Sequence, residues 1–259
     1  IIGSEALVRW NHPVHGLLMP GSFIPLFERN GLVVDIDMHI FEQVCMTMKS
    51  WRLRNLPLRT VSCNFSRLHF DRPEFPRQLV EIAGRYAIPH DLLEVEITES
   101  AIMKNPEAAW LRLIQLKQFG FKTAIDDFGS GYSSLGLVQM LNADVIKIDR
   151  SFVQRDLPGQ RAQIVLGSII RLALELEMAV ICEGVETAEQ AAILMRLGCF
   201  KAQGFYYATP EPENEFEARL AKSIHDLGWG TFVSYLEQAM AARGHLLLRA
   251  GQFDPTTQA

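Results

Sequence analysis

The stretch TAIDDFGSGYSS, residues 123–134, runs from an apolar, strand-like segment straight into two adjacent carboxylates. Asp126 and Asp127 are followed by a loop with glycines at positions 129 and 131. Neighbouring ionised carboxylates repel each other and lose solvation when they leave water. The pair therefore requires a compensating cation or free access to solvent, and the rest of the chain indicates which one it has.

Strand-like segments recur along the chain and alternate with amphipathic helical patterns. The strand-like segments are residues 5–10, 60–66, 93–98, 122–126, 144–149, 179–184 and 202–207, and the helical patterns include residues 36–54, 106–119, 161–177 and 188–197. Such alternation is typical of a parallel sheet. Seven or eight units in one chain fit a (β/α)8 barrel better than an open sheet, so we expect the α/β class.

Composition excludes several kinds of protein. The formal net charge of −5 over 259 residues argues against a surface for a nucleic-acid polymer. The four cysteines, Cys45, Cys63, Cys182 and Cys199, form no CxxC motif, and we interpret them as reduced core thiols. No apolar run reaches the roughly 18–20 residues of a membrane helix. We expect a cytoplasmic domain without membrane contact, or one on the cytoplasmic side of a membrane-anchored parent protein.

The two ends of the chain lead to separate expectations. The chain starts at Ile1 without a methionine, and a strand-like segment follows almost at once, so we expect a longer parent protein with further domains. We expect residues 1–222 to form one domain and residues 223–259 to form an extension. The extension has one amphipathic helix over residues 231–243 and a tail without fixed structure. Packing of this helix on the barrel is a simpler reading than a partner contact.

Polar residues end most of the strand-like segments. In a (β/α)8 barrel these ends converge on one face, where the active site lies. The residues at the ends are Glu5, Asn64, Glu96, Asp126, Asp127, Lys147, Glu183 and Gln203. Any one of them taken alone is explained more simply as a helix cap, a solvated acid or a counter-ion. Their coincidence in so many segments indicates a common site.

Five carboxylates on one face repel each other unless divalent cations lie among them. Oxygen ligands select magnesium or manganese over zinc, and no histidine cluster has the spacing of a metal site. Two such ions bridged by an acid such as Asp126 are suited to the attack of water on a phosphate ester. Lys147 would orient that water or neutralise developing charge, or would serve only as the counter-ion of the acids.

The glycine-rich stretch GSGYSSLG, residues 129–136, has an alternative reading as a phosphate-binding loop. It matches neither GxGxxG nor GxxxxGK[ST], and two acids directly before it would repel a phosphate. A lid beside the metals fits better, with Ser133 or Ser134 as the cap of the next helix.

Seven motifs in this order resemble the EAL domain family, bacterial phosphodiesterases that hydrolyse cyclic di-GMP to linear pGpG. The motifs are Glu5-Ala6-Leu7 in SEALVRW, NFS at 64–66, EITES at 96–100, DDFGSGYSSL at 126–135, IKIDRSFV at 146–153, EGVET at 183–187 and QGFYYATP at 203–210. The resemblance implies an EAL phosphodiesterase domain with a TIM-like (β/α)8 barrel that has one antiparallel strand. It also implies that the first strand of the barrel is missing from this chain, and that the domain forms homodimers near the DDFG loop.

The resemblance further implies roles for individual residues. It assigns Glu5, Asn64, Glu96 and Asp126 to one Mg²⁺ or Mn²⁺ ion, and Asp126, Asp127 and Glu183 to a second. It places Lys147 near the attacking water, makes Glu183 a general base, and makes Glu99 the acid that anchors the DDFG loop. It assigns cyclic di-GMP binding to Leu7, Arg9, Gln203 and Pro210.

Two other functions remain open from the sequence. The first is a catalytically silent receptor that binds cyclic di-GMP and signals to attached domains. Every metal-ligand position is filled with the expected residue, which favours the enzyme because loss of one ligand would remove the water-activating centre. The second is a scaffold that uses the C-terminal helix, and it is compatible with either activity.

Overall fold

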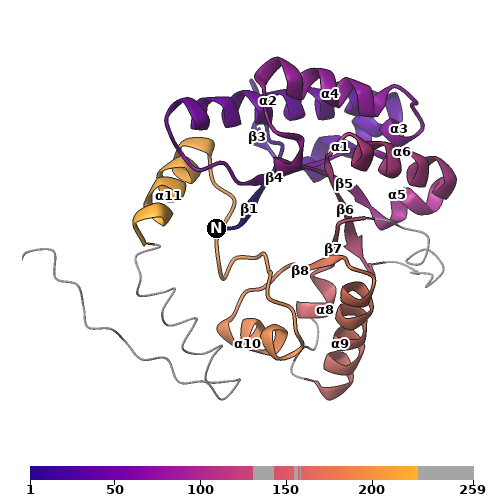
Figure 1. Cartoon of the computed structure of the whole chain (residues 1–259), viewed down its shortest axis with the longest axis vertical. Helices are drawn as coiled ribbons and strands as arrows, with labels where there is room; N and C mark the ends of the chain where they lie inside the picture. The colour runs from indigo at the N-terminus through magenta and orange to yellow at the C-terminus, as the bar shows by residue number, and fades with distance from the viewer. Residues whose placement is uncertain (131–142, 155–156, 158, 227–259) are drawn as a thin grey trace, which may run out of the picture. The chain divides into compact units, whose positions relative to one another are not determined.

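The computed structural model describes residues 1–130, 143–154, 157 and 159–226 (Figure 1). The chain divides into two compact units, residues 2–210 and a second unit of residue 1 with the residues from 211 onward. In the second unit the described residues form helix α11 (Glu213–Asp226). The predicted helix over 231–243 and the predicted lid beyond Ser130 lie outside the described residues. The domain boundary at residue 222 stays a prediction.

A six-stranded parallel sheet forms the centre of the larger unit. Its strands, in spatial order, are β1 (Gly3–Ala6), β4 (Thr60–Asn64), β5 (Leu93–Thr98), β6 (Lys122–Phe128), β7 (Val145–Ile148) and β8 (Ala179–Cys182). Each neighbouring pair is parallel. The strands curl around a common centre, and the helices lie outside them (Figure 1). The predicted α/β fold with a TIM-like parallel barrel is confirmed.

Helices cover the outer face of the sheet. They are α1 (Pro20–Asn30), α2 (Val33–Leu53), α3 (Arg67–Phe70), α4 (Phe75–Tyr86), α5 (Glu99–Lys104), α6 (Pro106–Gln118), α8 (Ser151–Gln154), α9 (Gln160–Glu175) and α10 (Ala188–Arg196), with a 3₁₀ turn, η1 (His90–Leu92), before β5. Their apolar faces supply fully buried side chains such as Phe41, Met48, Leu79 and Leu116. All four cysteines are buried and free. None of the helices in the described ranges is both long and apolar enough to cross a bilayer.

The alternation of β5 separates core residues from polar ones. Side chains two residues apart point to the same face of a strand. Val95 and Ile97 therefore share one face and Glu94 and Glu96 share the other, although all four are buried. Burial on both faces is typical of parallel sheets covered by helices. The face that lies inside the curl carries the acids.

Two of the predicted strands differ from the observed ones. The segment 5–10 is not one strand, because β1 ends at Ala6 and β2 (Trp10–His12) pairs antiparallel with β3 (Gly16–Leu18) in a separate two-stranded sheet. The Trp10 ring packs against Phe23 and Phe27, with centroids 5.7 and 5.6 Å away. This aromatic contact fixes the ribbon against α1. In the described residues, the antiparallel pairing lies in this ribbon and the larger sheet is parallel throughout.

The segment 202–207 contributes only one β-bridge, between Ala202 and Cys182. Gly204 has φ 154°, and a Cβ there would overlap the backbone of Val185. The backbone N–H of Tyr206 then donates to the carbonyl of Val185 at 2.9 Å. The chain therefore turns after Gln203, and the strand predicted beyond that residue was wrong.

Candidate metal site at the carboxyl edge of the sheet

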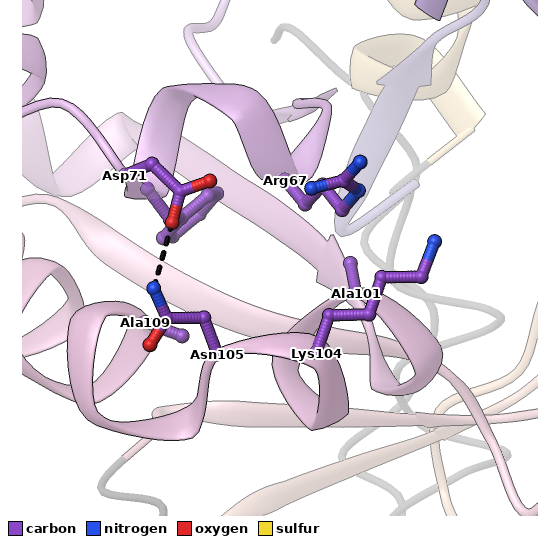
Figure 2. A pocket seen from close by; sticks show the side chains of 7 residues that line it. Arg67, Asp71, Ala101, Lys104, Asn105 and Ala109 are labelled. Carbon is purple, nitrogen blue, oxygen red and sulfur yellow. Dashed lines mark hydrogen bonds between the residues drawn. The ribbon is translucent and has the colours of Figure 1, made fainter.

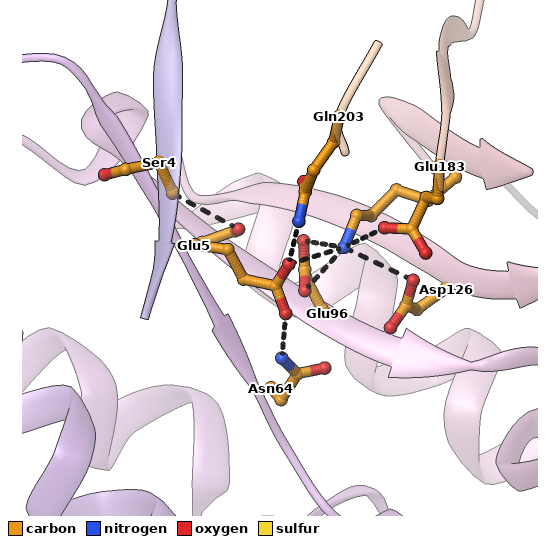
Figure 3. A network of polar contacts seen from close by, with 9 residues as sticks. Ser4, Glu5, Asn64, Glu96, Asp126, Glu183 and Gln203 are labelled. Carbon is orange, nitrogen blue, oxygen red and sulfur yellow. Dashed lines mark hydrogen bonds and ion pairs between the residues drawn. The ribbon is translucent and has the colours of Figure 1, made fainter. Parts of the chain in front are cut away.

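Lys147 of β7 lies at the centre of the acid cluster. Figure 3 shows the carboxylates of Glu5, Glu96, Asp126 and Glu183 pointing toward one another. Its side chain is 2% exposed. Four carboxylates from other parts of the sheet lie within ion-pair distance of its Nζ. They are Glu183 at 2.9 Å, Glu96 at 3.1 Å, and Glu5 and Asp126 at 3.3 Å each. The convergence of strand-end acids that the sequence predicted is therefore present around one buried ammonium group.

The charges of this cluster are unbalanced. Burial works to lower the pKa of Lys147, but the carboxylates of Glu96, Glu5, Asp126 and Glu183 outweigh it and raise that pKa. Burial raises the pKa of Glu96 well above its usual range and that of Glu183 to about 7, although Lys147 opposes both shifts. Four acids around one ammonium leave excess negative charge, so the cluster holds protons near neutral pH unless another cation replaces them.

Glu5 connects the first strand to two amides. Its Oε1 accepts a hydrogen bond from Asn64 Nδ2 at 2.7 Å, and its Oε2 accepts one from Gln203 Nε2 at 2.8 Å. Burial alone would raise the pKa of Glu5, but Lys147 and these two amides lower it. Glu5 is therefore ionised at neutral pH, and it brings Asn64 of β4 and Gln203 to the same point.

A β-bulge explains the adjacent acids of β6. Ile125 pairs with Ile146 and Phe128 pairs with Ile148, so β6 has one more residue than β7 between these pairs. Asp127 lies in the bulge with φ 54°, in the left-handed region. Adjacent side chains of a regular strand point to opposite faces. The bulge allows both carboxylates to reach the same place, where oxygens of Asp126, Asp127 and Glu183 lie within 4.8 Å of one another.

The donor set of the cluster fits a hard divalent cation. Asp126, Asp127 and Glu183 form a group that can hold a metal ion. The buried oxygens Glu96 Oε1 and Asp126 Oδ1 contact Lys147 but accept no hydrogen bond from the described residues. Carboxylate and amide oxygens are the ligands that Mg²⁺ and Mn²⁺ prefer. Excess negative charge and buried oxygens that accept no hydrogen bond point to the same kind of ion.

The loop after β6 is held by an acid from the neighbouring helix. Glu99, the first residue of α5, accepts a hydrogen bond at Oε2 from the backbone N–H of Gly129 at 2.7 Å. Gly129 has φ 88°, and a Cβ there would overlap the Phe152 ring. The catalytic role predicted for Glu99 stays a prediction.

The residues predicted to bind substrate lie less centrally. Gln203 donates a hydrogen bond to Glu5, whereas the guanidinium group of Arg9 donates one to the carbonyl of Val8 at 2.8 Å. Leu7 is 42% exposed and Pro210 is exposed as well. In the described part of the chain, Leu7, Arg9 and Pro210 make no hydrogen bond or ion pair with the acids.

The described residues line at least two hollows outside the acid cluster. The first lies between α3 and the helices α5 and α6, where Asn105 Nδ2 donates to Asp71 Oδ1 at 2.9 Å and Arg67 and Lys104 line the opening (Figure 2). Its volume of about 10 Å³ suits a water molecule and no larger ligand. The second is an open pocket of about 360 Å³ near the ends of β6 and β7, within the size range of ligand sites. Its lining is Ser130, Asp149, Arg150, Ser151 and Gln154.

The sequence reasoning missed one acid of the inner face. Glu94 is 6% exposed and precedes Glu96 by two residues. Burial raises its pKa, and Lys147 is the largest of the charges that lower it again. The alternation in LEVEIT would have indicated it, because residues i and i+2 of a strand share a face.

A curled parallel sheet with clustered carboxylates at its carboxyl edge defines an α/β barrel protein with a candidate metal site. The model of the family described as EAL domain matches residues 1–210. The chain therefore belongs to the EAL domain family.

Two curated relatives share this region. Oxygen sensor protein DosP of Escherichia coli is 36% identical over 215 residues, which cover 83% of this chain and 27% of DosP. Bifunctional diguanylate cyclase/cyclic di-GMP phosphodiesterase MucR of Pseudomonas aeruginosa is 36% identical over 221 residues, which cover 85% of this chain and 32% of MucR. The chain thus spans about a third or less of the length of these relatives.

A solved structure, PaMucR Phosphodiesterase, c-di-GMP complex, superposes with a TM-score of 0.78 at 36% identity. The match covers 83% of this chain and 87% of that chain. A second, EAL Enzyme Bd1971 in its cAMP and cyclic-di-GMP bound form, has a TM-score of 0.78 at 31% identity and covers 85% of this chain and 60% of that chain. The chain is thus homologous to proteins named as phosphodiesterases and to structures named as complexes with cyclic di-GMP.

Proposed function

We propose that this chain is a metal-dependent phosphodiesterase that hydrolyses cyclic di-GMP to linear pGpG. The observation that carries the proposal is the cluster of strand-end carboxylates around Lys147, completed by the bulge at Asp127. The names of the homologous MucR protein and of its cyclic di-GMP complex supply the substrate and the reaction.

Six residues would hold a pair of Mg²⁺ or Mn²⁺ ions. They are Glu5, Asn64, Glu96, Asp126, Asp127 and Glu183. When bound, such ions lower the pKa of a water molecule and neutralise the charge of a phosphate ester. These six residues lie on or directly after four adjacent strands and the last strand of the sheet, which gives a rigid frame for substrate orientation.

Lys147 and Glu183 have the properties needed for the proton chemistry. The ammonium group of Lys147 stays charged, so it can orient the attacking water and neutralise developing negative charge. Burial brings the pKa of Glu183 to about 7, which suits a carboxylate that accepts a proton near neutral pH. Glu99 supports the reaction indirectly, because it holds the backbone of Gly129 next to Asp127.

Substrate contacts would come from residues around this centre. Gln203 offers an amide beside Glu5, and Arg9 offers a guanidinium group suited to a phosphate. Leu7 and Pro210 are exposed and would line the nucleotide groove. We further propose that the domain forms a homodimer, works on the cytoplasmic side and belongs to a longer chain, as the greater length of its relatives suggests.

The receptor remains the second candidate function, since the matched structures carry cyclic di-GMP in their names. A receptor needs the groove but not the metal ligands. The presence of all six ligand residues and of Lys147 favours the enzyme.

The deciding experiment is a chromatographic assay of the purified protein with cyclic di-GMP and Mg²⁺ or Mn²⁺. We expect the wild type to form pGpG, and Glu5→Ala and Asp126→Ala to lower the rate by at least about 100-fold, because each removes a metal ligand. Glu107→Gln, at an exposed position of α6, is the control and should keep full activity. Binding without product in the wild type would establish the receptor, and neither binding nor product would overturn both functions.

A further inference from the structure

A buried histidine–aspartate pair lies behind the strand end that carries Asn64. His69 of α3 is 0% exposed, and its Nε2 lies 3.2 Å from Oδ2 of Asp37 in α2, whose side chain is 11% exposed. Neither ring nitrogen makes a hydrogen bond of regular geometry with a described residue, so Nε2 and Asp37 are joined by this close polar contact. The proposed hydrolysis uses neither residue. Burial of polar groups costs free energy unless they are paired or hydrogen-bonded, so the contacts of this pair show what it holds.

Asp37 holds the backbone just after β4. Its Oδ2 accepts a hydrogen bond from the backbone N–H of Ser66 at 2.8 Å. On the other side of this turn, the N–H of Phe65 donates to the carbonyl of Glu96 at 3.0 Å. The two residues that follow Asn64 are thus fixed by a helix on one side and by β5 on the other. The turn has little freedom to shift the Asn64 side chain.

Aromatic packing sets the direction of the His69 ring. The ring meets Phe65 edge-on, with centroids 5.2 Å apart, and packs on Phe75 at 4.7 Å. Of the two ring nitrogens, Nε2 is the one that faces an acceptor, Oδ2 of Asp37. Burial raises the pKa of Asp37, while His69 and the Ser66 N–H lower it in part. The Asp37 carboxylate therefore depends on both donors to remain a good acceptor.

The contacts form a continuous path to the acid cluster. The path leads from His69 through Asp37 to the Ser66 backbone, and two residues back to Asn64. Asn64 Nδ2 then donates to Glu5 Oε1 at 2.7 Å. We propose that His69 and Asp37 are positioning residues that hold the Asn64 amide in place for metal binding. As far as it concerns a metal, this inference rests on the proposed function.

The test compares two substitutions that differ in one donor. His69→Gln keeps an N–H donor at a similar reach, whereas His69→Leu keeps bulk and removes the donor. The matched control is His90→Leu, since the His90 ring also stacks on a phenylalanine, Phe121 at 4.5 Å, and its Nδ1 lies 2.6 Å from the Phe119 carbonyl. His90 precedes β5 and so lies at the opposite end of that strand from the acids.

The first measurement is Mn²⁺ binding followed by electron paramagnetic resonance without nucleotide. We expect His69→Leu to weaken Mn²⁺ binding by about 10- to 100-fold, the usual effect of removing a group that orients a ligand. His69→Gln and His90→Leu should stay within about threefold of the wild type by the same reasoning. The inference is overturned if His69→Leu binds Mn²⁺ like the wild type, if His69→Gln binds as weakly as His69→Leu, or if His90→Leu weakens binding as much.

The second measurement is hydrogen exchange at the Ser66 amide, which does not depend on a metal or on turnover. His69→Leu leaves the Asp37 carboxylate without its second polar contact, so its hydrogen bond to the Ser66 N–H weakens, and exchange at this amide should speed by at least about tenfold. The rate should return to the wild-type value in His69→Gln. If the wild type binds no Mn²⁺, the proposed metal centre fails, and exchange at Ser66 alone then decides the positioning role. An unchanged exchange rate in His69→Leu overturns it.

Discussion

Lys147 determines whether the acid cluster is stable without a metal. An isolated buried ammonium group would lose its proton, and four isolated buried carboxylates would keep theirs. Together they stabilise one another, since the Nζ of Lys147 lies 2.9–3.3 Å from an oxygen of each acid. Removal of one partner from such a set leaves charge that is buried and unpaired.

We therefore expect Lys147→Met to destabilise the metal-free protein by about 3–5 kcal/mol, the range for breaking a buried ion pair. The control is Lys117→Met, which removes a partly exposed partner 2.9 Å from Asp144 and should cost less than about 1 kcal/mol. Urea unfolding at pH 7.5 in the presence of a chelator measures both. Equal losses in the two variants would mean that the buried ammonium group contributes no more than a surface charge.

The strand-end residues could be predicted from the sequence, because the strands were recognisable as apolar runs and the barrel fold brings their ends together. Parallel strands of a barrel end on one face, and Glu96 and Lys147 follow apolar runs that could be recognised as strands. The bulge at Asp127 was not predictable, because its φ of 54° depends on the unequal register of β6 and β7. The His69–Asp37 pair was missed for a similar reason, since a contact between residues 32 positions apart has no local signal.

At the level of elements, Gln190 joins the start of α10 to α8. Its Oε1 accepts hydrogen bonds from the backbone N–H groups of Glu186 at 2.7 Å and Thr187 at 3.0 Å. Its Nε2 donates to the carbonyl of Val153 at 3.2 Å. Thr187 completes a capping box, because its Oγ1 accepts the N–H of Gln190 at 3.2 Å. The segment that follows Glu183 is therefore fixed at its far end.

Gln190→Ala should lower the free energy of unfolding by about 1–2 kcal/mol, because it removes half of the capping box and the contact with Val153. Met195→Ala, at a position of α10 that is 51% exposed, should change it by less than about 0.5 kcal/mol. Chemical denaturation followed by circular dichroism gives both values. If the two substitutions had the same effect, the contacts of Gln190 would not stabilise the fold.

Helices and strands with strong hydrophobic periodicity were predicted correctly, whereas a segment bent by a contact with another part of the chain was not. The helix predicted over residues 106–119 is α6 (Pro106–Gln118), which starts at the Asn105 cap and Pro106. The segment 202–207 has the composition of a strand, yet Gly204 turns it because the chain must pass against Val185. Composition records the preference of a segment, whereas the close approach of another backbone decides its path.

For the whole molecule, the acid cluster joins strands from one edge of the sheet to the other. Glu5 lies on β1, and Glu183 follows β8, the last strand in the spatial order. A pair of divalent cations held by Glu5, Glu183 and the acids between them would cross-link the two edges of the sheet. Any ligand that binds only the folded state stabilises it, by about 2.7 kcal/mol at 100 times its dissociation constant.

The size of this stabilisation should depend on pH in a defined direction. The folded-state pKa of Glu183 is raised from 4.5 to about 7, and that of Glu96 is raised as well. Between pH 4.5 and about 7, the metal-free folded protein binds more protons at Glu183 than the unfolded chain does. Its free energy of unfolding therefore falls as the pH rises through this range. Glu5 has a lowered pKa, and its opposite contribution lies at lower pH. Protons and Mn²⁺ compete for the same oxygens, so metal binding strengthens over the pH range in which stability without metal declines.

We therefore expect 1 mM Mn²⁺ to raise the melting temperature more at pH 8 than at pH 6, by roughly 2–4 °C for each kcal/mol of added stability. Calorimetry at the two pH values, with and without the metal, measures the difference. Asp126→Ala should abolish the shift at both pH values, because Asp126 belongs with Asp127 and Glu183 to the group of carboxylates that can hold a metal ion. A shift of equal size at pH 6 and pH 8 would show that the metal does not displace protons from Glu183 and Glu96, and would place any bound Mn²⁺ outside the acid cluster.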